Sequence, residues 1–390
     1  MSGDTPSGPL GVWLVGARGS VATTTMTGAA ALVRGLAPDT GLVTFSPPFA
    51  DAPLVSLDQV VFGGHDLVET PLSLRAAALV DAGVIPQGLP DAVAESLAAA
   101  EVDIRQGIGW HEARTSPRAA IRRAAADLRA FRERHGAERV VVINASSTEP
   151  PVQAHPAHDH PDSVLEAIDR DLGILPPSSL YALAAIETGC AFVDFTPSTG
   201  ARLPGLQALA RAHGAPLGGS DGKTGETMLK AALAPAFNSR ALRVRSWAGT
   251  NLLGGGDGHA LADPDRARSK LASKGRSLEQ ILGYQVEAPV RIEQIRDLGE
   301  WKTAWDHITF EGFLGVRMRM QFTWEGCDSA LAAPLLLDLA RLAGLALDRG
   351  EVGPLPDLAF FFKDPMGTDK HALHEQYEML SAWVTEGISV

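Results

Sequence analysis

Lysine is scarce in this sequence: seven stand among 390 residues, and none of them precedes residue 223. Lysine and arginine together number 34, so arginine supplies most of the ordinary positive charge. Arginine cannot give up its proton, whereas a desolvated lysine can, and lysine presents a compact point charge. Any one lysine is also open to a surface role, but their scarcity indicates a cationic, proton-transferring site for an anionic substrate.

Cysteine is scarcer still, with two residues, and negative charge predominates. Cys190 and Cys327 provide neither a disulfide framework nor the spacing of a metal cluster, so we expect a reduced, cytoplasmic setting. The net charge of −12 argues against nucleic acid or an anionic membrane as a partner, because both need a basic face. The N-terminus lacks the pattern of a signal peptide. The longest apolar stretch, 330–347, contains Asp338 and Arg341, which indicates a core helix rather than a membrane span.

Short buried-strand patterns alternate with helical patterns in the first part of the chain. Strands are predicted at 11–15, 42–45, 139–143 and 191–195. Strands that alternate with helices predict an α/β fold with a parallel, doubly wound sheet.

The pattern changes after about residue 240. Residues 287–323 contain period-two alternation, with Val316, Met318, Met320 and Phe322 on one side. This pattern predicts an antiparallel sheet with one covered face, as part of an inserted α+β domain. Residues 358–362 are predicted as another buried strand, followed by a final helix at 371–385. The expected division is therefore 1–240, an insertion at 241–326, and a return to the first domain at 327–390.

A glycine-rich turn follows the first predicted strand. Gly16, Gly19 and Ala22 stand at the spacing of a dinucleotide-binding turn that opens a helix, where free N–H groups favour an anion. The match departs from the usual pattern at Arg18. An acidic residue is also missing at the end of the predicted second strand, which reads Thr44-Phe45-Ser46. By itself this motif leaves two readings open, an NAD site and a strand-to-helix turn without a ligand.

Five of the lysines stand in segments marked by glycine, serine or proline: Lys223, Lys270, Lys274, Lys302 and Lys363. The segment 219–227 resembles a phosphate-cradling loop but lacks the spacing of an ATP-binding P-loop. Lys270 and Lys274 are four residues apart, a spacing that suits an anion between them. The segment 151–162, with three histidines, is interpreted as a solvated loop rather than a metal site.

These segments together resemble the myo-inositol phosphate synthase family, in order and along most of the chain. The matching segments are the turn at 16–24 and residues 61–66, 147–149, 177–182, 192–205, 221–227, 256–258, 268–274, 299–302, 327–334 and 363–365. The resemblance implies a Rossmann-type NAD domain built from both ends of the chain, an inserted catalytic and tetramerisation domain, and a homotetramer. It implies NAD as cofactor and a hexose 6-phosphate as substrate, which is oxidised at carbon 5, enolised, closed by an internal aldol reaction and reduced again.

The resemblance also implies roles for individual residues. Lys223, Lys270 and Lys363 are the first catalytic candidates, Lys274 and Lys302 would hold phosphate or an oxyanion, and Asp221 and Glu300 would orient lysines or relay protons. The implied cofactor-binding residues are Gly16, Ala17, Arg18, Gly19, Ser20, Val21, Ala22, Asp66, Ser147, Thr148, Ser178 and Asp257. The implied substrate-binding residues are Thr196, Thr199, Gly225 and Thr227, with Lys274 and Lys302.

The chain departs from the family pattern at several positions near the implied substrate. These include Ser220, the pair Gly255-Gly256, Glu300, Trp301 and Asp364. Glucose 6-phosphate, giving 1D-myo-inositol 3-phosphate, is the first expectation, and fructose 6-phosphate, closing to a five-membered ring, is the alternative. An ordinary NAD-dependent dehydrogenase and a non-catalytic NAD sensor are the rival classes. Whether Asp221, Asp257 and Glu300 bind a metal ion stays open, with carboxylate–lysine pairing the simpler account.

Overall fold

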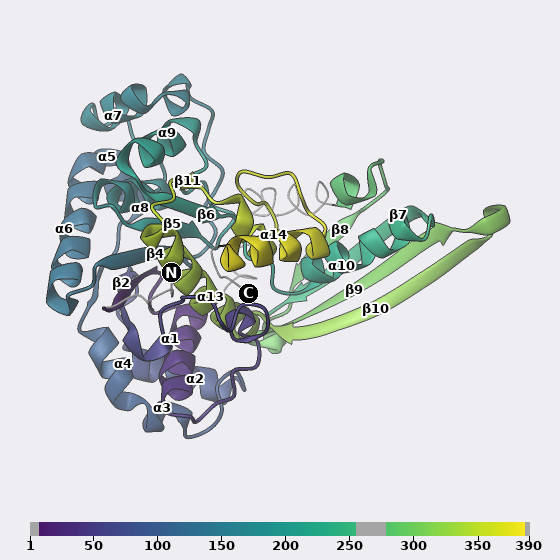
Figure 1. Ribbon diagram of the computed structural model, residues 1–390, viewed down its shortest axis with the longest axis horizontal. Coiled ribbons are helices and arrows are strands. Elements are labelled where there is room, and N and C mark those ends of the chain that lie inside the picture. The colour runs from purple at the N-terminus through teal and green to yellow at the C-terminus, as the bar shows by residue number, and fades with distance from the viewer. Residues whose placement is uncertain (1–7, 255–277, 387–390) are drawn as a thin grey trace.

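The computed structural model describes residues 8–254 and 278–386. Its main body is built on a seven-stranded sheet in the order β11-β6-β5-β4-β1-β2-β3, with every pairing parallel (Figure 1). The strands are β1 (Leu10–Val15), β2 (Val60–Asp66), β3 (Ile104–Gln106), β4 (Arg139–Asn144), β5 (Ala191–Asp194), β6 (Pro216–Gly219) and β11 (Gly353–Pro354). The strand order reverses between β1 and β4, and this is where a doubly wound sheet forms a crevice beyond its carboxyl ends.

Helices cover both faces of this sheet, which is why β1 and β4 are buried along their whole length. On one face lie α1 (Ser20–Val33), α2 (Leu72–Asp81), α4 (Ala94–Glu101), α13 (Asp328–Asp348) and α14 (Leu373–Thr385). On the other lie α6 (Pro117–His135), α7 (Pro161–Asp169), α8 (Pro177–Glu187) and α9 (Pro204–His213), while α3 (Leu89–Ala92) and α5 (Trp110–Thr115) are short links. The fold is therefore the doubly wound α/β class that the alternation predicts.

Helix α13 is long and apolar enough by composition to cross a membrane, yet most of it is buried inside the fold. It packs against α1 and against the central strands β4 and β5. Asp338 on this helix is fully buried and accepts hydrogen bonds from the backbone of Val43 and Thr44, at 2.8 and 3.1 Å. The expectation of a core helix is confirmed.

Two predicted strands are wrong. Residues 42–45 do not pair with the sheet, because Val43–Phe45 forms a 3₁₀ helix whose N–H groups are bound by Asp338. Residues 358–362 likewise fall largely in the 3₁₀ helix Pro356–Phe361. An apolar run of four or five residues has no period long enough to separate a strand from a short buried helix. The true second strand is β2, and it ends in Asp66, so the acidic residue that seemed missing is present.

The second sheet has four strands in the order β10-β9-β7-β8: β7 (Arg243–Leu253), β8 (Val290–Gln294), β9 (Trp301–Glu311) and β10 (Arg317–Cys327). Helix α10 (Glu226–Ser239) covers one face, where Phe237, Trp247 and Ile308 form a separate core. The β7–β8 pairing is parallel, so the sheet is mixed and the purely antiparallel prediction is wrong.

The predicted covered side of β10 is covered only in part. Met320 and Phe322 pack against the core below α10, whereas Val316 and Met318 are exposed. These two residues lie near the tip of the β9–β10 hairpin, which extends beyond α10 (Figure 1).

Candidate active site

A cleft of about 760 Å³ lies along the carboxyl edge of the parallel sheet, at the point where the strand order reverses. Most of the predicted cofactor-binding residues line it: Gly16, Arg18, Gly19, Ser20, Val21, Asp66, Ser147, Thr148 and Ser178. The predicted Ala17 and Ala22 are fully buried beneath the turn instead, and Asp257 lies outside the described residues.

The glycine-rich turn fits a dinucleotide. Gly16 has a φ of +84°, and a Cβ there would meet the Cα of Ser146 at 2.8 Å, so only glycine keeps the two loops this close. Gly19 caps the N-terminus of α1 with extended backbone, leaving the first N–H groups of the helix directed at the cleft. A carboxylate at the end of β2, Asp66, stands where an adenosine ribose would donate its hydroxyls. These residues therefore fit NAD.

Arg18 serves the turn in a way that the sequence did not indicate. Its backbone N–H donates to Asp66 Oδ2 at 2.7 Å, while its Nε donates to Glu101 at 3.1 Å and its Nη1 to the carbonyl of Val68 at 3.0 Å. Glu101 also accepts from the N–H of Leu72 at 2.7 Å. The Arg18 side chain thus ties the glycine-rich turn to α4 and to the loop that opens α2.

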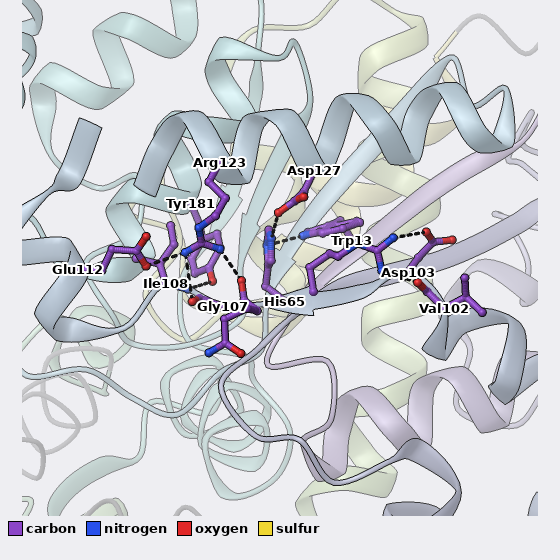
Figure 2. Close-up of polar contacts among 12 residues, drawn as sticks. Trp13, His65, Val102, Asp103, Gly107, Ile108, Glu112, Arg123, Asp127 and Tyr181 are labelled. Carbon is purple, nitrogen blue, oxygen red and sulfur yellow. Dashed lines mark hydrogen bonds and ion pairs between the residues drawn. The ribbon is translucent and has the colours of Figure 1, made fainter. Parts of the chain in front are cut away.

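A buried polar network that sequence reasoning missed supports the floor of the cleft (Figure 2). Trp13 Nε1 donates to His65 Nδ1 at 2.9 Å, and His65 Nε2 lies 3.0 Å from Asp127. Burial lowers the pKa of His65, so the ring is neutral and donates its one proton to Asp127. Tyr181 accepts from the N–H of Ile108 at 2.6 Å, which fixes the chain beyond β3. The only signal in the sequence was the position of His65 beside Asp66.

A smaller chamber of about 120 Å³ adjoins the cleft. The two cavities share the lining residues Val21, Ala145, Ser146, Thr148, Leu253, Lys302 and Asp328. Because the chamber is also lined by Asn251 and Ile292 of the second sheet, it lies between the two sheets. A bound dinucleotide and a small substrate would therefore meet across a common wall.

Lys363 reaches the chamber from the C-terminal part of the chain. Its Nζ donates to Asp221 Oδ1 at 2.8 Å, and both side chains are largely buried. Backbone hydrogen bonds hold the two segments together, with Lys363 N donating to the carbonyl of Asp221 at 2.7 Å and Lys223 N to that of Phe361 at 2.8 Å. The pair joins residues 142 positions apart.

Lys302 lines both cavities and donates to Asp328, the first residue of α13. Asp328 also accepts from Thr224 Oγ1 at 2.8 Å, so it joins the second sheet to the loop before α10. Asp328 lies in a segment that resembles the family, but the sequence indicated no role for this residue. An acidic residue at the start of a helix that directly follows a strand was the available signal.

Lys223, another predicted catalytic lysine, is buried beside the chamber rather than in its lining. Its Nζ donates to Gln376 on α14 and lies 6.0 Å from the ring centre of Phe360. Burial, and secondly the charge of Lys363, lower the pKa of Lys223 to about 7. This ammonium therefore releases its proton near neutral pH. It does so outside the lining of the chamber, which Lys363 reaches.

The other predicted site residues are divided. Thr196, Gly225 and Thr227 line the chamber, whereas Thr199 lies in the following turn, where its carbonyl accepts from Arg202 N. Glu300 lines the cleft and pairs with Arg75 at 3.0 Å instead of with a lysine. Lys270 and Lys274 lie outside the described residues.

No group of three or more His, Cys, Asp or Glu side chains suited to a metal ion occurs in residues 8–254 and 278–386. The histidine-rich segment is nevertheless more ordered than the predicted solvated loop. Pro156–Asp159 forms a 3₁₀ helix, and His158 is buried with its Nε2 3.3 Å from the carbonyl of Ile174.

The doubly wound sheet, the glycine-rich turn and the adjoining lysine chamber define an NAD-binding enzyme of the Rossmann type. A family model described as myo-inositol-1-phosphate synthase matches residues 10–385. The chain therefore belongs to the myo-inositol-1-phosphate synthase family and is an enzyme of the NAD-dependent isomerase type.

Individual relatives agree with this family. Inositol-3-phosphate synthase 1 of Bacteroides thetaiotaomicron is 32% identical over 97% of this chain and 94% of its own length. Inositol-3-phosphate synthase 1 of Homo sapiens is 29% identical over 84% of this chain, which spans only 63% of the longer human protein. The structure of inositol-3-phosphate synthase from Caenorhabditis elegans, 24% identical, has a TM-score of 0.87 and covers 98% of this chain, with 86% of its own length matched. This last likeness confirms the fold.

Proposed function

We propose that this protein is an NAD-dependent cyclitol phosphate synthase that converts glucose 6-phosphate into 1D-myo-inositol 3-phosphate in the cytoplasm. The observation that carries the proposal is the chamber in which Lys363–Asp221 and Lys302–Asp328 meet beside the cofactor cleft. Two lysine ammonium groups, each oriented by a carboxylate, suit an anionic sugar phosphate whose reaction forms oxyanions.

NAD, when bound, supplies the acceptance and return of one hydride, so the reaction is redox-neutral. The residues of this chain have to handle the protons. The carbon-5 hydroxyl loses one proton and carbon 6 loses another. The aldehyde oxygen gains one as the ring closes, and the carbon-5 oxygen gains one as the ketone is reduced, so two protons leave and two return. Lys363 Nζ, held by Asp221, is placed to exchange a proton with the substrate. Lys302 Nζ is placed to stabilise an oxyanion at the wall that the two cavities share.

The substrate phosphate is assigned to the N-terminus of α10. Gly225 caps this 14-residue helix and lines the chamber together with Thr227, so free N–H groups and a hydroxyl face the same space. Phe195, Pro197 and Ile292 line part of the chamber, and their apolar side chains would limit the access of water to a reactive ketone.

The first experiment is phosphorus and carbon NMR of the purified protein with NAD and either hexose 6-phosphate. From glucose 6-phosphate we expect a six-membered cyclitol phosphate, with no net change of absorbance at 340 nm. A five-membered product from fructose 6-phosphate alone would retain the mechanism and reassign the substrate. NADH that accumulates in step with product would indicate a dehydrogenase, and no product from either sugar would overturn the cyclase assignment.

A homotetramer is part of the proposal. The β9–β10 hairpin exposes Phe313 and Leu314, at 88% and 83%, together with Val316, Met318 and Trp305. A group of exposed large apolar side chains on a projecting hairpin is typical of a protein–protein interface. We expect sedimentation at the mass of four chains, and a Phe313→Glu, Leu314→Glu variant that sediments as smaller species. A wild-type protein that sediments as a single chain would contradict the proposed homotetramer.

A further inference from the structure

Arg75, on the first turn of α2, lines the cofactor cleft. It belongs to none of the motifs that the sequence indicated. Its Nη2 donates to Ser20 Oγ, at the first position of α1, and pairs with Glu300 Oε1 at 3.0 Å. Ser20 and Glu300 also line the cleft. The guanidinium therefore stands at the helix N-terminus that opens onto the cofactor cleft.

Arg75 is the better placed of the two arginines at this turn. The Arg18 guanidinium is already bound to Glu101 and to the carbonyl of Val68. Glu101 also holds the N–H of Leu72, which fixes the start of α2 and hence the position of Arg75. Both contacts of Arg75 use Nη2, and a guanidinium carries five N–H donors, so the group keeps donors for an anion.

We propose that Arg75 binds the pyrophosphate of the dinucleotide, together with the N-terminus of α1. The inference rests on the cofactor placement proposed above. A guanidinium matches phosphate oxygens with two parallel N–H donors, and the helix N-terminus adds partial positive charge at the same point. Glu300 opposes this binding, because its carboxylate competes for the same guanidinium and repels the phosphate. Arg75 and Glu300 are therefore partners with opposite effects on nucleotide affinity.

The test is calorimetric titration of the cofactor-free protein with ADP and with adenosine. Arg75→Gln is expected to weaken ADP binding about tenfold, since a charge-assisted contact to phosphate is lost. Adenosine has no phosphate, so its affinity should stay within about twofold. Arg75→Lys keeps the positive charge but not the planar guanidinium, so its ADP affinity should lie between those of the wild type and Arg75→Gln. Thermal unfolding of each variant shows whether it is folded.

Glu300→Gln distinguishes phosphate binding from a purely structural role, in which the Arg75–Glu300 ion pair is only a latch that holds α2 against the second sheet. If Arg75 binds phosphate, Glu300→Gln binds ADP as tightly as the wild type or more tightly, while a latch makes both variants lose ADP affinity alike. Arg34→Gln is the matched control, because Arg34 pairs with Glu95 at the other end of α1, at 3.3 Å.

Three results would overturn the proposal: unchanged ADP affinity in Arg75→Gln, an equal loss for adenosine, or a wild-type protein that binds ADP no more tightly than adenosine. No hexose phosphate is present in these titrations. Failure here therefore leaves the product assay, and with it the proposed function, untouched.

Discussion

Replacing Lys363 with methionine is expected to lower kcat about a thousandfold, the usual size of a general acid–base contribution. Methionine keeps the length of the side chain and removes the group that exchanges protons. The variant lacks the amine that carries the proton. Asp221 also loses the ammonium that it holds at 2.8 Å, so it no longer orients a proton carrier. The measurement is the rate of cyclitol phosphate formation at saturating sugar phosphate, with NAD affinity determined in parallel.

Two further variants make this result interpretable. Lys370→Met changes an exposed lysine seven residues along the same segment and should leave kcat within about twofold, as for most surface substitutions. Asp221→Asn keeps the shape of the carboxylate and should lower kcat less than Lys363→Met does. A Lys363→Met protein that retains more than a tenth of wild-type kcat would show that the proton is carried elsewhere.

Replacing Lys230 with methionine is expected to lower the free energy of unfolding by about 3–5 kcal/mol, the cost of breaking a buried ion pair. Lys230 is buried on α10, with its Nζ 2.6 Å from Glu226 and 3.3 Å from Asp306. Asp306 also accepts from Trp247 Nε1 at 2.7 Å. Without the ammonium, two buried carboxylates face each other under the second sheet.

The loss of stability should be larger at high pH than at low pH. Burial raises the pKa of Asp306, whereas the charge of Lys230 lowers it. In the variant this pKa rises further, so the folded protein binds a proton that the unfolded chain releases, and stability falls as pH increases. Urea denaturation at pH 8 and pH 5.5, at fixed protein concentration without NAD, should show the larger loss at pH 8.

A companion substitution tests the cause of that loss. Adding Glu226→Gln to Lys230→Met removes one of the two facing carboxylates and should restore part of the stability. A loss below about 1 kcal/mol, or one of equal size at both pH values, would mean that the positive charge of Lys230 is not what stabilises the buried carboxylates.

The sequence by itself determined the class of fold and the location of the cofactor turn. Gly16 and Gly19 follow a buried strand and precede a helix, and this local order is enough to predict where an anion can approach the backbone. The long helix α13 was equally readable, because its apolar stretch extends over many turns. The retained lysines pointed to the chemistry, since residue type alone limits which side chains exchange protons.

Only the tertiary structure decided which of these residues meet. Lys363 and Asp221 are 142 positions apart and become neighbours through backbone hydrogen bonds between two loops. Arg75 and Glu300 are 225 apart, and nothing local marks either as a partner of the other. Short segments failed for the same reason: Val43–Phe45 is a 3₁₀ helix because Asp338, nearly 300 residues away, binds its N–H groups. Local pattern specifies elements, whereas contacts between distant segments specify the site.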